Sequence, residues 1–385
     1  MNENKEYKQY FIGLLSGTSI DSIDVAITEI NSHDFKLIAT HSHEIPKELK
    51  QTLQDIIINQ ATNLKTFGET NRQLGTVFAE AIMSILKKSS VCAEEIIAIG
   101  FHGQTIYHHP VLPYNFSLQI GDPNTIVETT GIPVITDFRQ RDMVNFGQGA
   151  PLAPLFHQKY FTDNLISRAI VNIGGITNIT LLGNNTSNRL SSADLGPGNT
   201  LLDQWYLKHN NKYHYDHNGL WAKSGTFDPE LLSLLLDDPY FMQPWPKSTG
   251  REYFNLAWLN NYLNKNNQTQ ISQISPENIQ RTLLELTALL ISKTIESHNN
   301  KNHQKITEIY LCGGGVHNQL LFDRITELLF PLNVQTTEAL GVPPDSVEAA
   351  LFAWLAYNTW NQQKLDLQAI TGNIKSRTIL GCIYY

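Results

Sequence analysis

The sequence predicts an α/β protein made of two diverged copies of one structural unit. An apolar strand, a glycine-containing turn and an alternating strand are predicted at residues 11–30 and again at residues 169–182. A helical stretch, an apolar strand and a glycine turn occur at residues 73–103 in the first half and at residues 279–315 in the second. Because both halves follow one order, we interpret the chain as an internal duplication.

In the first half, periodicity defines the elements. Residues 11–15 are apolar, and residues 23–30 alternate between apolar and polar positions, which predicts two strands. Apolar residues at helical spacing predict helix within residues 46–88. Short apolar strands follow at 94–100, 117–120 and 134–136, each ending in polar or glycine-containing residues.

The second half repeats these signals. Strands are predicted at 169–173, 177–182 and 308–311, a long helix at 279–295 and a last, mostly apolar helix at 346–357. Residues 206–275 are rich in Asn, Trp and Pro, and no fold is predicted for them. Glycine turns are predicted after four apolar strands, at Gly17, Gly103, 174–175 and 313–315. In two-lobed α/β proteins such turns gather at the carboxyl ends of strands, where ligands bind.

Composition narrows the class of protein. The 385 residues are 41% hydrophobic and 17% charged, as in globular proteins, and the net charge of −8 argues against a nucleic-acid or anionic-membrane partner. No apolar run reaches 18 residues, and the apolar stretch near the N-terminus is too short for a signal peptide. Three widely spaced cysteines fit neither a disulfide framework nor a zinc site. We therefore expect a cytoplasmic protein.

Residues 16–22, Ser-Gly-Thr-Ser-Ile-Asp-Ser, form a candidate phosphate-binding turn. Glycine lets a backbone approach a ligand, hydroxyl and N–H groups bind phosphate oxygens, and a carboxylate can hold Mg²⁺, often through water. The alternative is an ordinary hairpin with polar turn residues. Neither a P-loop nor a dinucleotide fingerprint is present, so a nucleotide site would use another design.

Asp194 is the candidate general base. It precedes Leu-Gly-Pro-Gly-Asn-Thr, residues 195–200, and a predicted helix start whose N–H groups could bind an anion, with Asn199 or Thr200 as a cap. A carboxylate there could take a proton from a nucleophile next to the γ-phosphate. The alternative is an aspartate in a Gly-Pro turn.

Other polar residues are weaker candidates. Arg139 could clamp an anionic group or belong to a local salt-bridge network, and Glu348 could contact substrate or only open a helix. His102 could be functional or a hydrogen-bonded structural histidine. His214, Asp216 and His217 could bind a metal, but a solvated loop is the favoured interpretation.

Ten short motifs, in order along nearly the whole chain, are similar to those of anhydro-N-acetylmuramic acid kinases. The first, Gly-Thr-Ser-Ile-Asp-Ser-Ile-Asp, resembles the SGTSxDGxD opening of that family. The motifs lie at residues 17–24, 100–105, 119–124, 137–139, 147–152, 172–178, 194–199, 246–252, 312–315 and 344–349.

The resemblance implies two duplicated actin/hexokinase-like (ribonuclease H-like) domains with an ATP cleft between them. We expect one lobe at 1–137 with about 345–385, and the other at 138–344. It also implies a cytoplasmic homodimer that acts in murein recycling. With ATP and Mg²⁺ it would hydrolyse the 1,6-anhydro bridge of anhydro-N-acetylmuramic acid and phosphorylate O6, giving N-acetylmuramic acid 6-phosphate and ADP.

By motif, the resemblance assigns roles to individual residues. Asp194 would be the base, Asp21 would hold Mg²⁺ through water, and Arg139, Glu348 and His102 would contact the sugar. The cofactor-binding residues would be Gly17, Thr18, Ser19, Ile20, Asp21, Ser22, Ile23, Asp24, Gly174, Gly196, Gly198, Asn199, Gly313, Gly314 and Gly315.

One residue departs from the family pattern, and two other functions remain open. Ser22 stands where the family usually has glycine, which would cost about 1 kcal/mol or more if the position needs a positive φ. A kinase of this fold acting on another amino sugar or small acid is one alternative. A non-catalytic nucleotide- or sugar-binding sensor is the other, but the short N-terminal extension leaves no room for a DNA-binding domain.

Overall fold

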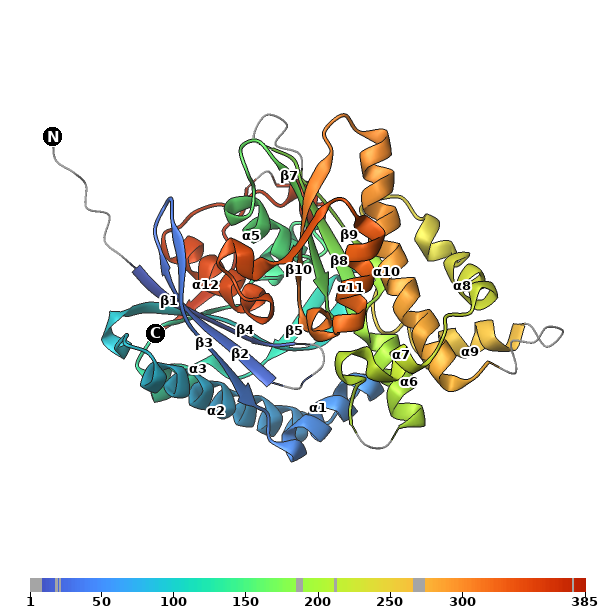
Figure 1. Cartoon of the computed structure of the whole chain (residues 1–385). Coiled ribbons are helices and arrows are strands. Elements are labelled where there is room, and N and C mark those ends of the chain that lie inside the picture. The colour runs from blue at the N-terminus through green and yellow to red at the C-terminus, as the bar shows by residue number, and fades with distance from the viewer. Residues whose placement is uncertain are drawn as a thin grey trace. The chain divides into compact units, whose positions relative to one another are not determined.

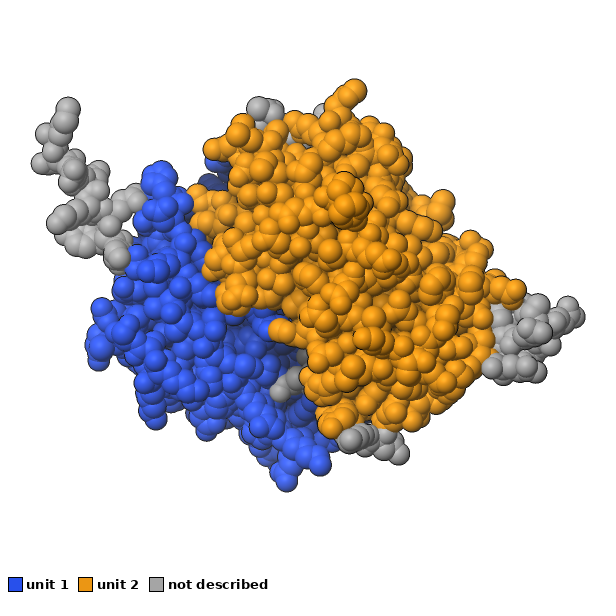
Figure 2. Space-filling view, viewed as in Figure 1, with its two compact units in different colours: residues 1–156, 345–385 blue, residues 157–344 orange. Residues whose placement is uncertain are grey.

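The computed structural model describes residues 9–17, 20, 22–184, 190–210, 213–265, 274–375 and 377–385. The chain divides into two compact units, which Figure 2 colours separately. Unit 1 comprises residues 1–156 and 345–385, and unit 2 comprises residues 157–344. Residues 138–156 therefore group with unit 1, whereas the sequence predicted a boundary after residue 137. In the described part of the chain, no helix has the length and apolarity needed to cross a membrane.

Unit 1 is built on a seven-stranded mixed sheet with the order β12-β6-β4-β1-β2-β3, in which β5 also pairs with β4 (Figure 1). Its strands are β1 (Gln9–Ser16), β2 (Ser22–Ile30), β3 (Phe35–Glu44), β4 (Ile96–His109), β5 (Phe116–Ile120), β6 (Val134–Thr136) and β12 (Cys382–Tyr384). Its helices are α1 (Lys47–Asn59), α2 (Leu64–Lys88), α3 (Pro123–Thr130), α4 (Gln140–Val144), α12 (Val347–Trp360) and α13 (Gln368–Thr371), and α5 (Ala153–Tyr160) runs across the boundary between the units.

Unit 2 repeats the central part of that sheet. Its order is β11-β10-β7-β8-β9, with β8 antiparallel to β7 and β9, and β10 parallel to β7 and β11. In unit 1, β1, β2, β3, β4 and β6 pair in the same order and directions. The predicted duplication is confirmed. The strands are β7 (Ser167–Ile173), β8 (Ile176–Leu182), β9 (Leu190–Pro197), β10 (Ile306–Cys312) and β11 (Asn333–Thr336). The helices are α6 (Asn199–His209), α7 (Leu220–Ser224), α8 (Pro229–Leu236), α9 (Leu256–Lys265), α10 (Pro276–Lys301) and α11 (Gln319–Leu329).

Several features differ from the prediction, and three of them bear on the site. Strand β3 was missed, since it is an edge strand that buries few of its side chains. Strand β4 continues through the expected turn at Gly103, which has a φ of +79° next to a register shift against β1. Asp194 lies within β9, and not in the Gly-Pro turn that was the alternative interpretation. Pro197 is the last residue of β9, an edge strand, where a residue without an N–H group is tolerated.

Two paired glycines allow α12 to pack directly on the unit 1 sheet. Gly13 of β1 and Gly100 of β4 are in register, and a Cβ on Gly13 would lie 1.9 Å from the Ala349 carbonyl oxygen of α12. A Cβ on Gly100 would lie 2.0 Å from the Phe352 carbonyl oxygen. Neighbouring residues on β1 face opposite ways, since Phe11 contacts Tyr357 of α12 while Ile12 belongs to the core with α2. Backbone therefore meets backbone at this contact, which fixes α12 closely to the sheet.

We expect Gly13→Ala to destabilise unit 1. The added methyl would meet backbone atoms of α12 that cannot rotate away, and overpacking of this kind costs about 1–3 kcal/mol. Gly68→Ala is the matched control: Gly68 is exposed in α2, and a Cβ added there would have no atom within 4 Å, so alanine should stabilise the helix by up to about 1 kcal/mol. Urea unfolding of both variants tests this contrast, and equal midpoints would contradict it.

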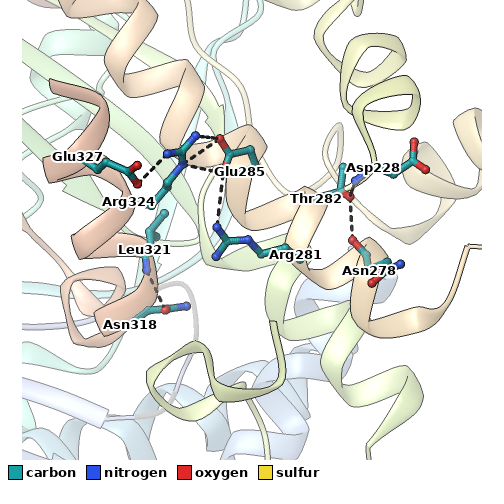
Figure 3. Close-up of polar contacts among 9 residues, drawn as sticks. All are labelled: Asp228, Asn278, Arg281, Thr282, Glu285, Asn318, Leu321, Arg324 and Glu327. Carbon is teal, nitrogen blue, oxygen red and sulfur yellow. Dashed lines mark hydrogen bonds and ion pairs between the residues drawn. The ribbon is translucent and has the colours of Figure 1, made fainter. Parts of the chain in front are cut away.

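An ion-pair network joins α10 to α11 in unit 2 (Figure 3). The Glu285 carboxylate is 1% exposed and accepts hydrogen bonds from Arg324 Nε and from a terminal nitrogen of the same guanidinium, at 2.6–3.0 Å. Arg281 lies 3.8 Å from Glu285, and Glu327 binds the other side of Arg324 at 2.7 Å. The buried carboxylate is thus paired and hydrogen-bonded, as a charge in a protein interior must be.

Candidate active site

The candidate phosphate-binding turn lies between β1 and β2 in unit 1. Thr18, Ser19 and Asp21 lie outside the described residues. Ile20 N–H donates to the Gly17 carbonyl at 3.1 Å, and the side chain of Ile20 is 3% exposed in the unit 1 core. Ile23 is also buried in that core. Any contact of these two isoleucines with a nucleotide would therefore come from their backbone.

Strain in this turn falls on Ile20 and not on Ser22. Ile20 has a φ of +57°, which is unfavourable for a β-branched residue and is found where the surrounding structure enforces it, often at functional sites. Ser22 begins β2 without a positive φ, and its hydroxyl donates to Asp24 Oδ1 at 3.2 Å. The substitution of serine for the usual glycine therefore carries no backbone penalty here.

Asp24, His102, Arg139 and Glu348 form an interacting group in unit 1. Arg139 Nε donates to His102 Nε2 at 3.0 Å, and Arg139 also donates to the Gly149 carbonyl at 2.7 Å. Burial lowers the pKa of Arg139 to about 10, opposed by the carboxylates of Glu348 and Asp142. Glu348 keeps contact with solvent, yet the protein packed around it raises its pKa; Arg139 opposes this shift and Asp24 adds to it. Burial also raises the pKa of Asp24.

His102 positions Arg139. Burial, with the Arg139 charge, lowers the pKa of His102 well below its usual value, so the ring is neutral. Since arginine is always the donor, His102 Nε2 accepts, and Nδ1 donates to the Gly103 carbonyl at 3.0 Å. The ring also stacks on Phe352 of α12, with centroids 4.5 Å apart. Both ring nitrogens are engaged within unit 1, which favours a positioning role over the direct sugar contact expected for it.

In unit 2, the predicted glycine-containing segments come together at the carboxyl ends of β7 and β10. A Cβ on Gly313 would lie 2.2 Å from Asn172 Oδ1, and one on Gly315 would lie 2.2 Å from Ile173 Cγ2. Asn199 Nδ2 donates to the Ile173 carbonyl at 3.3 Å and lies 4.0 Å from the Cβ position of Gly314. Gly196 is set apart: its Cβ position is 2.7 Å from Phe241, so this glycine makes room for an aromatic ring.

The backbone N–H groups at the start of α6 donate to backbone carbonyls of unit 2. The N–H groups of Gly198 and Thr200 donate to the Gly175 carbonyl at 3.0 and 3.1 Å, and Asn199 N–H donates to the Gly174 carbonyl at 2.8 Å. No side chain caps this helix. These bonds join α6 to the turn between β7 and β8. They also mean that a phosphate at this turn would need another source of positive charge.

Asp194 is held in place by three residues for which the sequence predicted no role. Thr249 N–H donates to Asp194 Oδ2 at 3.0 Å, Asp194 N–H donates to the Lys247 carbonyl at 3.0 Å, and Tyr240 OH donates to the Asp194 carbonyl at 2.8 Å. Burial raises the pKa of Asp194 to about 6; the Thr249 N–H lowers it, Glu252 raises it and Lys247 lowers it. A carboxyl with a pKa near 6 is a competent general base at neutral pH.

The raised pKa of Asp194 predicts an acidic limb in the pH–rate profile. The base must be ionised, so kcat/KM should fall as the pH drops through about 6. Glu252 raises this pKa, so Glu252→Gln should move the limb to lower pH, by a modest amount because Glu252 is exposed. Glu230→Gln, at an exposed position in α8, is the control and should leave the limb unchanged. A limb that stays in place in Glu252→Gln would contradict the expectation.

His214, Asp216 and His217, considered above as metal ligands, do not form a metal site among the described residues. Across the described ranges, no cluster of three or more His, Cys, Asp or Glu side chains could hold a metal ion. The Asp216 carboxylate instead accepts from the N–H groups of Trp221 and Ala222, at 2.8 and 2.9 Å, and so stabilises the start of α7. His214 and His217 therefore flank a structural aspartate.

Comparison with known proteins identifies the family. The sequence model of the anhydro-N-acetylmuramic acid kinase family matches residues 9–385. Anhydro-N-acetylmuramic acid kinase of Coxiella burnetii is 45% identical over 378 residues, covering 98% of each chain. The enzyme of that name from Photobacterium profundum is 43% identical over 377 residues, covering 97% of this chain and 98% of its own. The chain belongs to the anhydro-N-acetylmuramic acid kinase family.

Proposed function

We propose that the protein is an ATP-dependent kinase that opens the 1,6-anhydro bridge of anhydro-N-acetylmuramic acid with water and phosphorylates O6. The products are N-acetylmuramic acid 6-phosphate and ADP. Family membership over nearly the whole chain supports the reaction. The observation that carries the mechanism is Asp194, a half-buried carboxylate with a pKa near 6, which pairs on β9 with Asn178, three residues after the Gly174–Gly175 turn.

O6 of the anhydro sugar is an ether oxygen, so the C1–O6 bond must break before O6 can be phosphorylated. Water breaks this bond by attacking C1, and a base is needed to activate that water. Asp194 takes one proton from water, whose oxygen bonds to C1 and retains its other proton as the new hydroxyl. The C1–O6 bond breaks, O6 bonds to the γ-phosphorus, and the bond from phosphorus to the ADP oxygen breaks. Asp194 then releases its proton to solvent. General-base catalysis of this kind is typically worth about 10² to 10⁴ in rate.

The glycine turns are proposed to bind the nucleotide. Gly17–Asp24 would lie along the phosphates, and Gly174, Gly198, Asn199 and 313–315 would lie near the nucleotide. Asp21 is proposed to hold Mg²⁺ through water. The neighbouring side chains of Ser22 and Asp24 present oxygen atoms, the donors that Mg²⁺ prefers. Mg²⁺ would supply charge neutralisation at the β- and γ-phosphate oxygens.

Arg139 and Glu348 are proposed to contact the sugar. The planar guanidinium of Arg139, oriented by His102, suits the carboxylate of the lactyl group. The Glu348 carboxylate can accept hydrogen bonds from sugar hydroxyl groups. We further propose a cytoplasmic homodimer without a nucleic-acid or membrane partner, based on the family resemblance and the net charge of −8.

The test mixes purified protein with Mg-ATP and 1,6-anhydro-N-acetylmuramic acid and follows ADP and product mass. A product heavier than the sugar by one water and one phosphoryl group is expected. A gain of the phosphoryl group alone would indicate an ordinary sugar kinase. Absence of sugar-dependent ADP would refute this substrate and favour another amino sugar or a nucleotide-binding sensor.

A further inference from the structure

Residues 246–252, Pro-Lys-Ser-Thr-Gly-Arg-Glu, form a sequence motif that contains none of the proposed site residues. In unit 2 this segment lies beside β9, the edge strand of the sheet. Its backbone bonds twice to Asp194, through the Lys247 carbonyl and the Thr249 N–H. The motif is therefore attached to the proposed base.

Both ends of the segment are fixed. Lys247 Nζ donates to the carbonyls of Tyr240 and Phe241 at 3.0 and 3.2 Å and lies 4.4 Å from the centre of the Tyr240 ring. At the other end, Tyr253 OH donates to Asp238 Oδ1 at 2.9 Å. Asp238 is 3% exposed and also accepts from Trp258 and Tyr262. Arg251 therefore sits on a turn that is anchored on either side.

The guanidinium of Arg251 lies against Gly175, in the turn between β7 and β8. A Cβ on Gly175 would be 2.8 Å from a terminal nitrogen, 2.9 Å from Nε and 3.2 Å from Cζ of Arg251. A larger residue at position 175 would require the guanidinium to shift from this position. Because the two units are duplicates, this turn corresponds to the turn at Gly17 between β1 and β2, the predicted phosphate site.

Charge considerations assign different tasks to the two cations of the motif. Lys247 is committed to backbone carbonyls and an aromatic ring, and the N–H groups that begin α6 are committed to the carbonyls of Gly174 and Gly175. Arg251 is exposed, and its guanidinium lies at the turn itself. Its planar donor fork matches phosphate oxygens, which a lysine matches only as a point charge.

We propose that Arg251 binds the terminal phosphate of the nucleoside triphosphate at the Gly174–Gly175 turn and stabilises the charge on the phosphoryl group during transfer. This role rests on the proposed kinase function and deepens it. The same short segment would then align the base and the phosphate, since Thr249 N–H holds the Asp194 carboxylate two residues before Arg251. Removal of one preorganised donor to a transition-state charge typically costs about 10² to 10³ in kcat.

The test compares Arg251→Gln, Arg251→Lys and, as a charge-matched control, Lys223→Gln at an exposed position of α7. Steady-state kinetics give kcat and KM for ATP and for the sugar. Calorimetry without sugar, in the presence of Mg²⁺, gives the affinity for ADP and for a non-hydrolysable ATP analogue. We expect Arg251→Gln to lower kcat about 10² to 10³-fold and to weaken the analogue about tenfold more than ADP. Arg251→Lys should be intermediate, and Lys223→Gln should match the wild type.

Three results would overturn the proposal. An unchanged kcat with an unchanged ratio of analogue to ADP affinity would show that Arg251 does not meet the terminal phosphate. A raised KM for the sugar at unchanged kcat would assign the guanidinium to the sugar carboxylate. Equal weakening of both nucleotides with a lowered Tm would leave it a structural residue. If the wild type binds nucleotide but does not turn over the sugar, the kinase proposal fails, and the affinity ratio still decides the role of Arg251.

Discussion

Asp194→Asn is expected to lower kcat about 10² to 10⁴-fold while the protein remains folded and binds ATP. The amide cannot take a proton from the attacking water. It can still accept the hydrogen bond from Thr249 N–H through its oxygen, so the local geometry should be preserved. The loss should therefore appear in the chemical step, and not in the KM for ATP.

Single-turnover kinetics with the anhydro sugar, together with nucleotide titration, would separate these effects. Asp228→Asn serves as the control, because Asp228 caps α8 by accepting from Leu231 N–H and an asparagine can do the same. Turnover near the wild-type rate in Asp194→Asn would refute the assignment of the base. Loss of nucleotide affinity equal to the loss of kcat would point to a binding role.

Arg324→Met is expected to destabilise unit 2 by about 3–5 kcal/mol. Among the described residues, the substitution leaves the Glu285 carboxylate, which is 1% exposed, with Arg281 at 3.8 Å as its remaining charged partner (Figure 3). Removing one member of a buried pair leaves an uncompensated charge, which costs far more than the pair contributes when intact. Hydrogen exchange of α10 and α11 amides under increasing urea would measure the change.

Two further variants identify the origin of that loss. Arg324→Met combined with Glu285→Leu removes both charges and should recover most of the lost stability, because an apolar pair of similar volume often equals a buried ion pair. Glu327→Gln removes the exposed partner of Arg324 and should cost less than about 1 kcal/mol. A double variant as unstable as Arg324→Met would show that packing, and not charge, is responsible.

Local pattern was sufficient for several buried elements of the fold. The strands at 11–15, 23–30, 169–173 and 308–311 and the helices at 279–295 and 346–357 are parts of β1, β2, β7, β10, α10 and α12. The side chains of these elements are largely buried, so their sequences show apolar runs or apolar residues at strand or helix spacing. Edge strand β3 buries few of its side chains and was missed. Helices α7, α8 and α9 have only 5, 8 and 10 residues and lie in the segment 206–275, for which no fold was predicted.

The sequence predicted only part of the candidate site. The glycine turns of unit 2 were predicted, because glycine after an apolar strand is a local signal. The support for Asp194 was not: Tyr240, Lys247 and Thr249 are 46–55 residues from it along the chain, and no local period relates them to β9. Arg251 lies still farther along the chain from Gly175, so its position at that turn follows from the fold alone.

The division of the chain has a consequence for biosynthesis. Unit 2 is encoded by one continuous stretch, 157–344, whereas unit 1 needs both the first 156 residues and α12 from the far end of the chain. The glycine faces of β1 and β4 have no helix to cover them until α12 has left the ribosome. Domains generally fold as units during synthesis. Unit 2 should therefore reach its native state on the ribosome before unit 1, whose strands are made earlier but whose folding requires the last tenth of the chain.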